Sequence, residues 1–162
     1  MVLYLVGFMG SGKSTVGRLV AEKLGVAFID LDQSIEKLSG LTISEIFSKE
    51  GEAGFRKRET QVLLQTPASG IIATGGGIIT KPQNREFLAK MPVVYLKTSL
   101  LEIENRLIKA PGSRPLLNED LKKLLAQREP LYMEVAKHVI NTDEKTPTEV
   151  AREVILWISP LI

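Results

Sequence analysis

The chain contains no cysteine, one histidine and one tryptophan among its 162 residues. The lack of cysteine excludes a disulfide framework and a thiolate metal site. Neither sign of charge dominates, because 21 basic residues are interleaved with 19 acidic ones and the net charge is +2. Nucleic-acid binding needs clustered positive charge, so this distribution argues against a nucleic-acid partner. No apolar run reaches the roughly 18 residues that span a bilayer, so we expect no membrane partner either.

The N-terminal segment lacks the pattern of a secretory signal. Its apolar run, residues 2–6, is interrupted by Gly7 and is followed by no small-residue cleavage site. We therefore expect a cytoplasmic protein. The chain length and the ordinary globular composition, with 44% hydrophobic and 25% charged residues, predict a single domain over residues 1–162. We also expect a monomer.

Residues 7–14 read G-F-M-G-S-G-K-S, the spacing of a phosphate-binding loop. They follow an apolar run typical of a buried strand and precede a stretch with helical periodicity, residues 15–24. The glycines allow positive φ and close approach to phosphate oxygens, so that successive N–H groups can point at one anion. In such a loop Lys13 reaches the β- and γ-phosphates and the Ser14 hydroxyl ligates Mg²⁺. The pattern predicts a nucleoside triphosphate site, and a glycine-rich turn with a solvated lysine is the alternative.

Short apolar runs alternate with helix-patterned segments along the whole chain. This alternation indicates parallel strands joined by right-handed helical crossovers. The expected fold is a doubly wound α/β domain with three layers around a five-stranded parallel sheet. The expected strands are residues 2–6, 26–29, 70–73, 93–96 and 138–140. The expected helices are residues 14–24, 32–38, 42–49, 50–64, 82–90, 99–109, 118–134 and 147–158.

Residues 110–117, A-P-G-S-R-P-L-L, fit no helix, because two prolines and a glycine interrupt them. In an enzyme that transfers phosphoryl groups, such a loop is a candidate mobile lid over the nucleotide, and a plain helix–helix connector is the alternative. Arg114 in this loop and Arg106 one helix earlier are candidate triphosphate ligands. A guanidinium offers a planar fork of donors suited to phosphate. The alternative for both arginines is surface charge.

Two aspartates follow the second apolar run. Ligands of doubly wound sheets bind beyond the carboxyl ends of the strands, so residues at this position are site candidates. Asp30 and Asp32 are separated by one residue, and an extended backbone would place both carboxylates on the same side. Either carboxylate can hold Mg²⁺ through water or accept a hydroxyl proton from an acceptor substrate. The alternative for Asp32 is that it caps the next helix.

The third apolar run is followed by Thr74-Gly75-Gly76-Gly77. Many phosphate-loop proteins have an acidic metal ligand at this position. Three glycines in its place predict that backbone N–H groups face the transferring phosphoryl group or the acceptor. A tight turn is the alternative.

Two further arginines lie at helical spacing among apolar residues. Arg56 precedes Glu59 by three positions, and a solvated pair of this kind stabilises a helix by only about 0.3–0.5 kcal/mol. Because Glu59 has apolar neighbours, a buried glutamate that orients Arg56 toward an anion is favoured. Arg128 shares a helix face with several leucines, where a guanidinium must reach the surface or meet an anion. His138, which begins an apolar strand, is expected to be structural.

The motifs G-F-M-G-S-G-K-S-T, D-L-D, F-R-K-R-E, T-G-G-G, S-R-P-L-L and R-E-P-L-Y, in this order, closely resemble those of the shikimate kinase family. The resemblance extends from residue 2 to about residue 147. It implies a nucleoside-monophosphate-kinase-like fold with strand order 2-3-1-4-5. It also implies transfer of the γ-phosphoryl group of MgATP to the 3-hydroxyl of shikimate, which gives ADP and shikimate 3-phosphate for aromatic amino-acid biosynthesis.

The resemblance implies roles for individual residues as well. Those implied to bind ATP are Gly10, Ser11, Gly12, Lys13, Ser14, Thr15, Arg106, Arg114 and Lys145, with Pro147 beside the adenine. Those implied to bind shikimate are Asp32, Arg56, Gly76 and Arg128, to which the analysis of the residues adds Glu59, Gly75 and Gly77. One Mg²⁺ ion would be held by Ser14 and, through water, by Asp30 and Asp32. The implied catalytic residues are Lys13, Asp32 as candidate base, and Arg114. The chain departs from the family at Lys145, where arginine is frequent, and in its short lid between Arg106 and Arg114.

Two other functions are compatible with the phosphate-binding loop. Another small-molecule kinase, acting on gluconate or on a nucleoside monophosphate, shares residues 7–15 but gives no reason for T-G-G-G together with R-E-P-L-Y. A nucleotide-binding module that transfers no phosphate is the other alternative. The residues alone indicate an acceptor that is a small alcohol bearing a carboxylate.

Overall fold

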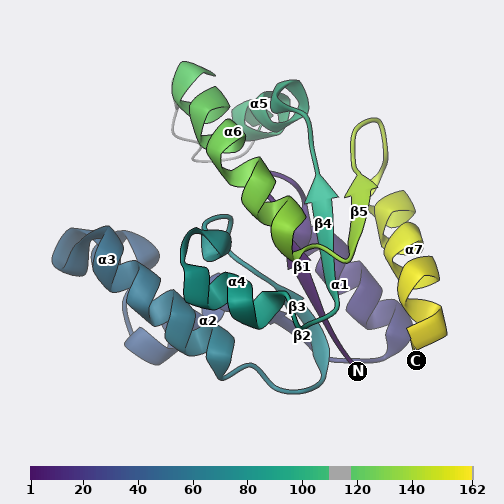
Figure 1. Cartoon of the computed structure of the whole chain (residues 1–162), viewed down its shortest axis with the longest axis horizontal. Coiled ribbons are helices and arrows are strands. Elements are labelled where there is room, and N and C mark those ends of the chain that lie inside the picture. The colour runs from purple at the N-terminus through teal and green to yellow at the C-terminus, as the bar shows by residue number, and fades with distance from the viewer. Residues whose placement is uncertain (110–117, 162) are drawn as a thin grey trace.

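The computed structural model describes residues 1–109 and 118–161, and its strands form one parallel sheet between two layers of helices (Figure 1). The sheet order is β2-β3-β1-β4-β5, and every neighbouring pair is parallel. The expected fold class and strand order are therefore confirmed. The strands are β1 (Val2–Val6), β2 (Phe28–Asp30), β3 (Gly70–Ala73), β4 (Val93–Lys97) and β5 (His138–Asn141).

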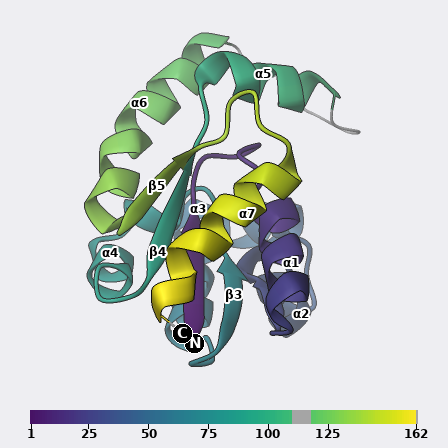
Figure 2. The same cartoon turned by 90° about the vertical axis from the view of Figure 1, so that its right-hand side faces the viewer.

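Side chains alternate between the two faces of the central strand β1, which explains its uninterrupted apolar sequence. Leu3 and Leu5 pack with helices α1 and α7, whereas Tyr4 and Val6 pack with helices from the other layer. Figure 2 shows α1 and α7 together on one side of the sheet, opposite α4 and α6. The helices are α1 (Lys13–Leu24), α2 (Leu31–Ser39), α3 (Ile43–Leu64), α4 (Pro82–Leu88), α5 (Leu100–Lys109), α6 (Asn118–Val135) and α7 (Pro147–Ile158), with short 3₁₀ turns at Ile78–Thr80 and Ser159–Leu161.

Most element ends differ from the expected ones by one or two residues, and three differences have a physical reason. The two helices expected over 42–64 form one element, α3, but Gly51 interrupts it with φ 70° and ψ −177°, close to the expected break. The second strand starts at Phe28 rather than at residue 26, because Gly25 ends α1 in a left-handed conformation and the chain needs two residues to reach the sheet. The two 3₁₀ turns were not expected, since three-residue elements leave no periodic pattern.

The structure describes no helix with both the length and the apolar character needed to cross a bilayer, within residues 1–109 and 118–161. The expected lid, 110–117, and with it Arg114, lies outside the described residues. His138 stacks on Trp157 of α7 with the ring centroids 5.3 Å apart, which agrees with its expected structural role.

Candidate active site

The loop between β1 and α1 has the backbone conformation that phosphate binding requires. Gly10 and Gly12 have φ values of 77° and 93°, in the left-handed region that favours glycine. Helix α1 begins at Lys13, so its N-terminal amides and the positive end of its dipole lie at the loop. The loop therefore presents consecutive N–H groups to a position that suits an anion.

Lys13 lies folded under this loop. Its Nζ donates hydrogen bonds to the carbonyl oxygens of Gly7 (2.7 Å) and Phe8 (2.9 Å), and the residue is only 8% exposed. Burial lowers the pKa of Lys13 to about 8, because carbonyl dipoles replace water only partly around the ammonium group. A phosphate oxygen would supply the missing counter-charge, so the lysine is poised for an anion at the loop.

Asp30 holds the start of α2 and the hydroxyl of Ser14. One carboxylate oxygen, Oδ1, accepts from the backbone N–H groups of Asp32 (3.0 Å) and Gln33 (3.3 Å), and the other, Oδ2, accepts from Ser14 Oγ (2.7 Å). The cap of α2 is thus Asp30, and the alternative that Asp32 caps this helix is wrong. The extended backbone also ends at Asp30, since the cap turns the chain into α2, so the extended conformation expected over Asp30–Asp32 is wrong.

Both carboxylates nevertheless line one cavity of about 280 Å³, here called the aspartate cavity. Asp32 Oδ1 is buried and has no hydrogen-bond partner within residues 1–109 and 118–161. Burial raises the pKa of Asp32, and the charge of Asp30 raises it further against the opposing effect of Lys13 and Arg56. A buried carboxylate oxygen that lacks a donor suits a substrate hydroxyl. The cavity is lined by Met9, Gly10, Gly12, Lys13, Ser14, Thr15, Asp30, Asp32, Thr74, Gly75 and Gly76.

Charged side chains from other segments occupy the space beside the triglycine loop, Gly75–Gly77, where larger residues would place their own side chains. A Cβ on Gly75 would lie 2.9 Å from Asp32 Oδ1 and 2.8 Å from Glu59 Oε2. A Cβ on Gly77 would overlap the guanidinium of Arg56. A side chain at position 75 or 77 would therefore displace these charged groups, which the simple tight-turn alternative does not explain.

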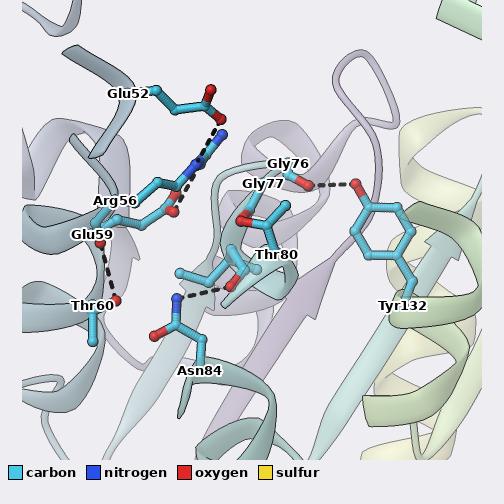
Figure 3. A network of polar contacts seen from close by, with 10 residues as sticks. Glu52, Arg56, Glu59, Thr60, Gly76, Gly77, Thr80, Asn84 and Tyr132 are labelled. Atoms are coloured by element: carbon cyan, nitrogen blue, oxygen red, sulfur yellow. Dashed lines mark hydrogen bonds and ion pairs between the residues drawn. The ribbon is translucent and has the colours of Figure 1, made fainter. Parts of the chain in front are cut away.

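Arg56 and Glu59 form a buried ion pair on α3. Their Nη1 and Oε1 atoms are 2.8 Å apart, the Arg56 side chain is 12% exposed and Glu59 only 1% (Figure 3). Burial raises the pKa of Glu59, while Arg56 opposes this shift. The predicted buried glutamate is therefore confirmed over a solvated surface pair, and Glu59 fixes the direction of the guanidinium.

Arg128 approaches the same loop from α6. Its Nη1 lies 3.5 Å from the position of a Cβ on Gly76, and its Cζ lies 5.8 Å from the centroid of the Phe8 ring. Its Nε is buried and has no hydrogen-bond partner in the part of the chain that the structure describes. Buried guanidinium donors without acceptors are costly unless an anion meets them. The structure thus brings Arg56 and Arg128, 72 positions apart in sequence, to one three-residue loop.

A second cavity, of about 450 Å³ and here called the arginine cavity, lies between the phosphate-binding loop and the β5–α7 connection. Arg106 donates from Nη1 to the carbonyl of Gly10 (3.1 Å) and from Nε to Glu102 (2.9 Å). Lys145 pairs with Glu153 of α7 at 2.7 Å. Arg106 and Lys145 therefore line one cavity, and their roles in ATP binding stay predictions. Its lining residues are Gly10, Ser11, Gly12, Thr15, Val16, Glu102, Arg106, Thr142, Lys145, Pro147 and Val150.

Sequence analysis missed three residues of this region. Tyr132, fully buried, donates its phenolic proton to the carbonyl of Gly76, while Glu102 and Thr142 line the arginine cavity. The sequence contains a signal for Tyr132, because this residue lies four positions after Arg128 and hence on the same helix face. No sequence pattern indicated that Glu102 and Thr142 line this cavity.

Comparison with known proteins agrees with this geometry. The family model described as "Shikimate kinase" matches residues 9–159. A shikimate kinase from Acinetobacter baylyi is 44% identical over 160 residues, which cover 94% of this chain and 89% of that protein. A shikimate kinase from Thermodesulfovibrio yellowstonii is also 44% identical, over 94% of this chain and 92% of that protein.

Solved structures show the same relation. Shikimate kinase from Acinetobacter baumannii, solved in complex with shikimate, superposes with a TM-score of 0.90 at 44% identity and covers 98% of this chain and 93% of that one. A gluconokinase from Sinorhizobium meliloti reaches a TM-score of 0.63 at 21% identity over 99% of this chain and 92% of that one, which shows a shared fold only. The chain therefore belongs to the shikimate kinase family.

Proposed function

We propose that the chain transfers the γ-phosphoryl group of ATP to the 3-hydroxyl group of shikimate, giving ADP and shikimate 3-phosphate. The observation that carries this proposal is the convergence of two half-buried arginines, Arg56 and Arg128, on a glycine loop beside an Asp32 oxygen that has no hydrogen-bond partner among the described residues. A cyclic acid with hydroxyl groups has the complementary chemistry. Its carboxylate meets the arginines, and one hydroxyl meets Asp32.

Asp32 and Lys13 line the same cavity and have different roles in phosphoryl transfer. Asp32 accepts a hydrogen bond from the acceptor hydroxyl and orients this oxygen for in-line attack on the γ-phosphorus. The hydroxyl proton passes to Asp32 as the new O–P bond forms and the bond to the ADP oxygen breaks. Lys13 stabilises the negative charge that the phosphoryl oxygens carry in the transition state.

The residues around Ser14 fit a magnesium ion. The Ser14 hydroxyl donates its proton to Asp30, so its lone pairs are available to a hard cation, and Asp30 and Asp32 line the same cavity. Among the described residues there is no cluster of three or more acidic, histidine or cysteine side chains that could hold a metal ion. We therefore place Mg²⁺ on Ser14 and the phosphates, with the aspartates acting through water. When bound, the ion neutralises phosphate charge.

The arginine cavity would hold the nucleoside part of ATP. Lys145 and Pro147 line it where adenine would lie, and Arg106 already bonds to the phosphate-binding loop through Gly10. The Glu153 carboxylate keeps Lys145 along α7. We propose that Arg114, outside the described residues, closes over the phosphates.

The test is ADP release by the purified protein with MgATP and, in parallel, shikimate, gluconate or a nucleoside monophosphate as acceptor. The proposal expects release with shikimate at a rate at least a hundred times that with the other acceptors. Release with gluconate or a nucleotide instead would assign another kinase activity. Release that depends on none of them, or no release, would favour a nucleotide-binding module.

Gly77→Ala should lower kcat/KM for shikimate by about a hundredfold, because the new methyl group displaces the Arg56 guanidinium. Gly77 has φ −98°, a value that alanine adopts freely, so backbone strain does not contribute. Steady-state kinetics with each substrate varied would measure the effect, and the KM for ATP should change less than twofold.

Gly76→Ala is the matched control for this prediction. Its Cβ would meet the Met9 nitrogen at 3.3 Å and Arg128 Nη1 at 3.5 Å, so a smaller loss is expected than at Gly77. Equal losses in the two variants would contradict the displacement of Arg56 as the cause.

A further inference from the structure

The carbonyl oxygens of the triglycine loop are all held by hydrogen bonds. Gly75 O accepts from the N–H of Ile78 (3.2 Å), and Gly77 O accepts from Thr80 Oγ1 (2.7 Å). Gly76 O accepts from the phenol of Tyr132, which reaches the loop from α6 (Figure 3). The orientation of each peptide in the loop is thereby fixed.

A fixed carbonyl also fixes the direction of the N–H group of the next residue, because the two point in opposite directions across a trans peptide. The bonds to Gly75 O and Gly76 O therefore fix the N–H groups of Gly76 and Gly77. The structure describes no cis peptide bond, so the rule applies throughout the loop. Among the described residues, the N–H groups of Gly75, Gly76 and Gly77 have no backbone acceptor. Gly75 and Gly76 line the aspartate cavity, where unpaired amides are available to a ligand.

The bond from Tyr132 differs in kind from the other two. Ile78 and Thr80 lie within three residues of the carbonyls that they hold, so their bonds form within one turn. Tyr132 lies 56 positions from Gly76, is fully buried, and packs its ring 5.0 Å from the ring of Tyr95. Its bond therefore ties the loop to α6.

Helix α6 thus contacts Gly76 at two points one helical turn apart. Arg128 Nη1 lies 3.5 Å from the position that a Cβ on Gly76 would occupy, and Tyr132 donates to the carbonyl of the same residue. Pro130 lies between them on the exposed face of the helix. The relative position of the Arg128 guanidinium and the loop amides is consequently set by one short segment, residues 128–132.

We propose that Tyr132 is a positioning residue for the acceptor. Its hydroxyl holds the triglycine loop in a fixed position relative to Arg128, so that the loop amides and the Arg128 guanidinium contact the acceptor together. This inference rests on the proposed function, because it takes the acceptor to be shikimate. Tyr132 itself touches no reacting atom. It acts through the peptide that follows Gly76.

Tyr132→Phe tests this role, since it removes only the hydroxyl and keeps the ring against Tyr95. We expect the KM and the calorimetric Kd for shikimate to rise about tenfold, the effect of one lost hydrogen bond at a site that must be ordered. The KM for ATP should change less than twofold, because none of the described residues that line the arginine cavity belongs to α6. Tyr95→Phe is the matched control, as it removes a neighbouring buried hydroxyl that does not reach the loop. It should leave both KM values within twofold.

A double-mutant cycle distinguishes positioning from general destabilisation. In an Arg128→Lys background, Tyr132→Phe should raise the KM for shikimate less than threefold. The Tyr132 hydroxyl positions the loop relative to the Arg128 guanidinium, and this guanidinium is already absent from the Arg128→Lys protein. A full tenfold rise in that background would overturn the proposal. So would an unchanged shikimate KM in Tyr132→Phe, or equal rises for both substrates that follow the loss of stability in urea. The wild-type protein distinguishes the proposed function from the positioning role of Tyr132. If the wild type does not phosphorylate shikimate, the proposed function is wrong. If the wild type does so and Tyr132→Phe has the same kinetic constants, only the positioning role is wrong.

Discussion

Lys13→Met is expected to lower kcat by at least about a thousandfold while the protein remains folded. The ammonium group lies buried under the phosphate-binding loop, where water screens charge weakly, and Lys13 lines the aspartate cavity together with Asp32. Removing one preorganised donor from such a site typically costs about two to three orders of magnitude in rate. Single-turnover formation of shikimate 3-phosphate measures the chemical step directly.

The control is Lys23→Met, which makes the same substitution in the exposed last turn of α1. It should leave kcat within twofold. Circular dichroism and urea unfolding of both variants should show a native fold. A Lys13→Met enzyme that keeps more than a tenth of the wild-type rate would contradict the catalytic role of this lysine.

The same substitution predicts a pH dependence of stability. Lys13 has a pKa of about 8 in the folded chain and an ordinary value of 10.5, so burial of its charge destabilises the folded state fully below pH 8. Between about pH 8 and 10.5 the unfolded chain binds more protons, and the free energy of unfolding of the wild type should rise relative to that of Lys13→Met. The expected slope is up to about 1.4 kcal/mol per pH unit. Urea unfolding of both proteins across this range measures it, and a flat difference would contradict the shift.

The architecture could be predicted from the sequence because its main signals are local. Each strand is a short apolar run, and each crossover is a segment with helical periodicity, so strand direction and layer follow from general rules. The sheet order came only from the resemblance to a family, because local patterns do not specify which strands become neighbours. The exact ends of elements also depend on capping, as the displacement of the cap from Asp32 to Asp30 shows.

The candidate site was predictable in composition but not in its internal contacts. Glycine at 75–77 was expected to expose amides, whereas the structure shows that it also makes room for Asp32, Arg56 and Glu59. Those side chains come from α2 and α3, and no spacing in the sequence reports a steric relation between such distant segments. The contact of Tyr132 with Gly76 could not be predicted for the same reason, although the spacing of Tyr132 from Arg128 places these two residues on one face of α6.

Arg128→Ala is expected to raise the KM for shikimate about a hundredfold and to change the KM for ATP less than twofold. The substitution removes a guanidinium that has a buried, unpartnered Nε beside Gly76, and a hydrogen-bonded ion pair at such a position typically contributes about 2–3 kcal/mol. Steady-state kinetics with shikimate as the varied substrate, together with calorimetric binding, measure the loss. Arg152→Ala on the exposed surface of α7 is the control and should behave as the wild type.

A modified substrate makes this prediction specific to the carboxylate. With the methyl ester of shikimate, the wild-type enzyme has no anion to bind at Arg128, so wild type and Arg128→Ala should have KM values within threefold of each other. A variant that still discriminates the acid from the ester as strongly as the wild type would place the carboxylate elsewhere. An unchanged KM for shikimate in Arg128→Ala would remove the argument for an acidic acceptor at this loop.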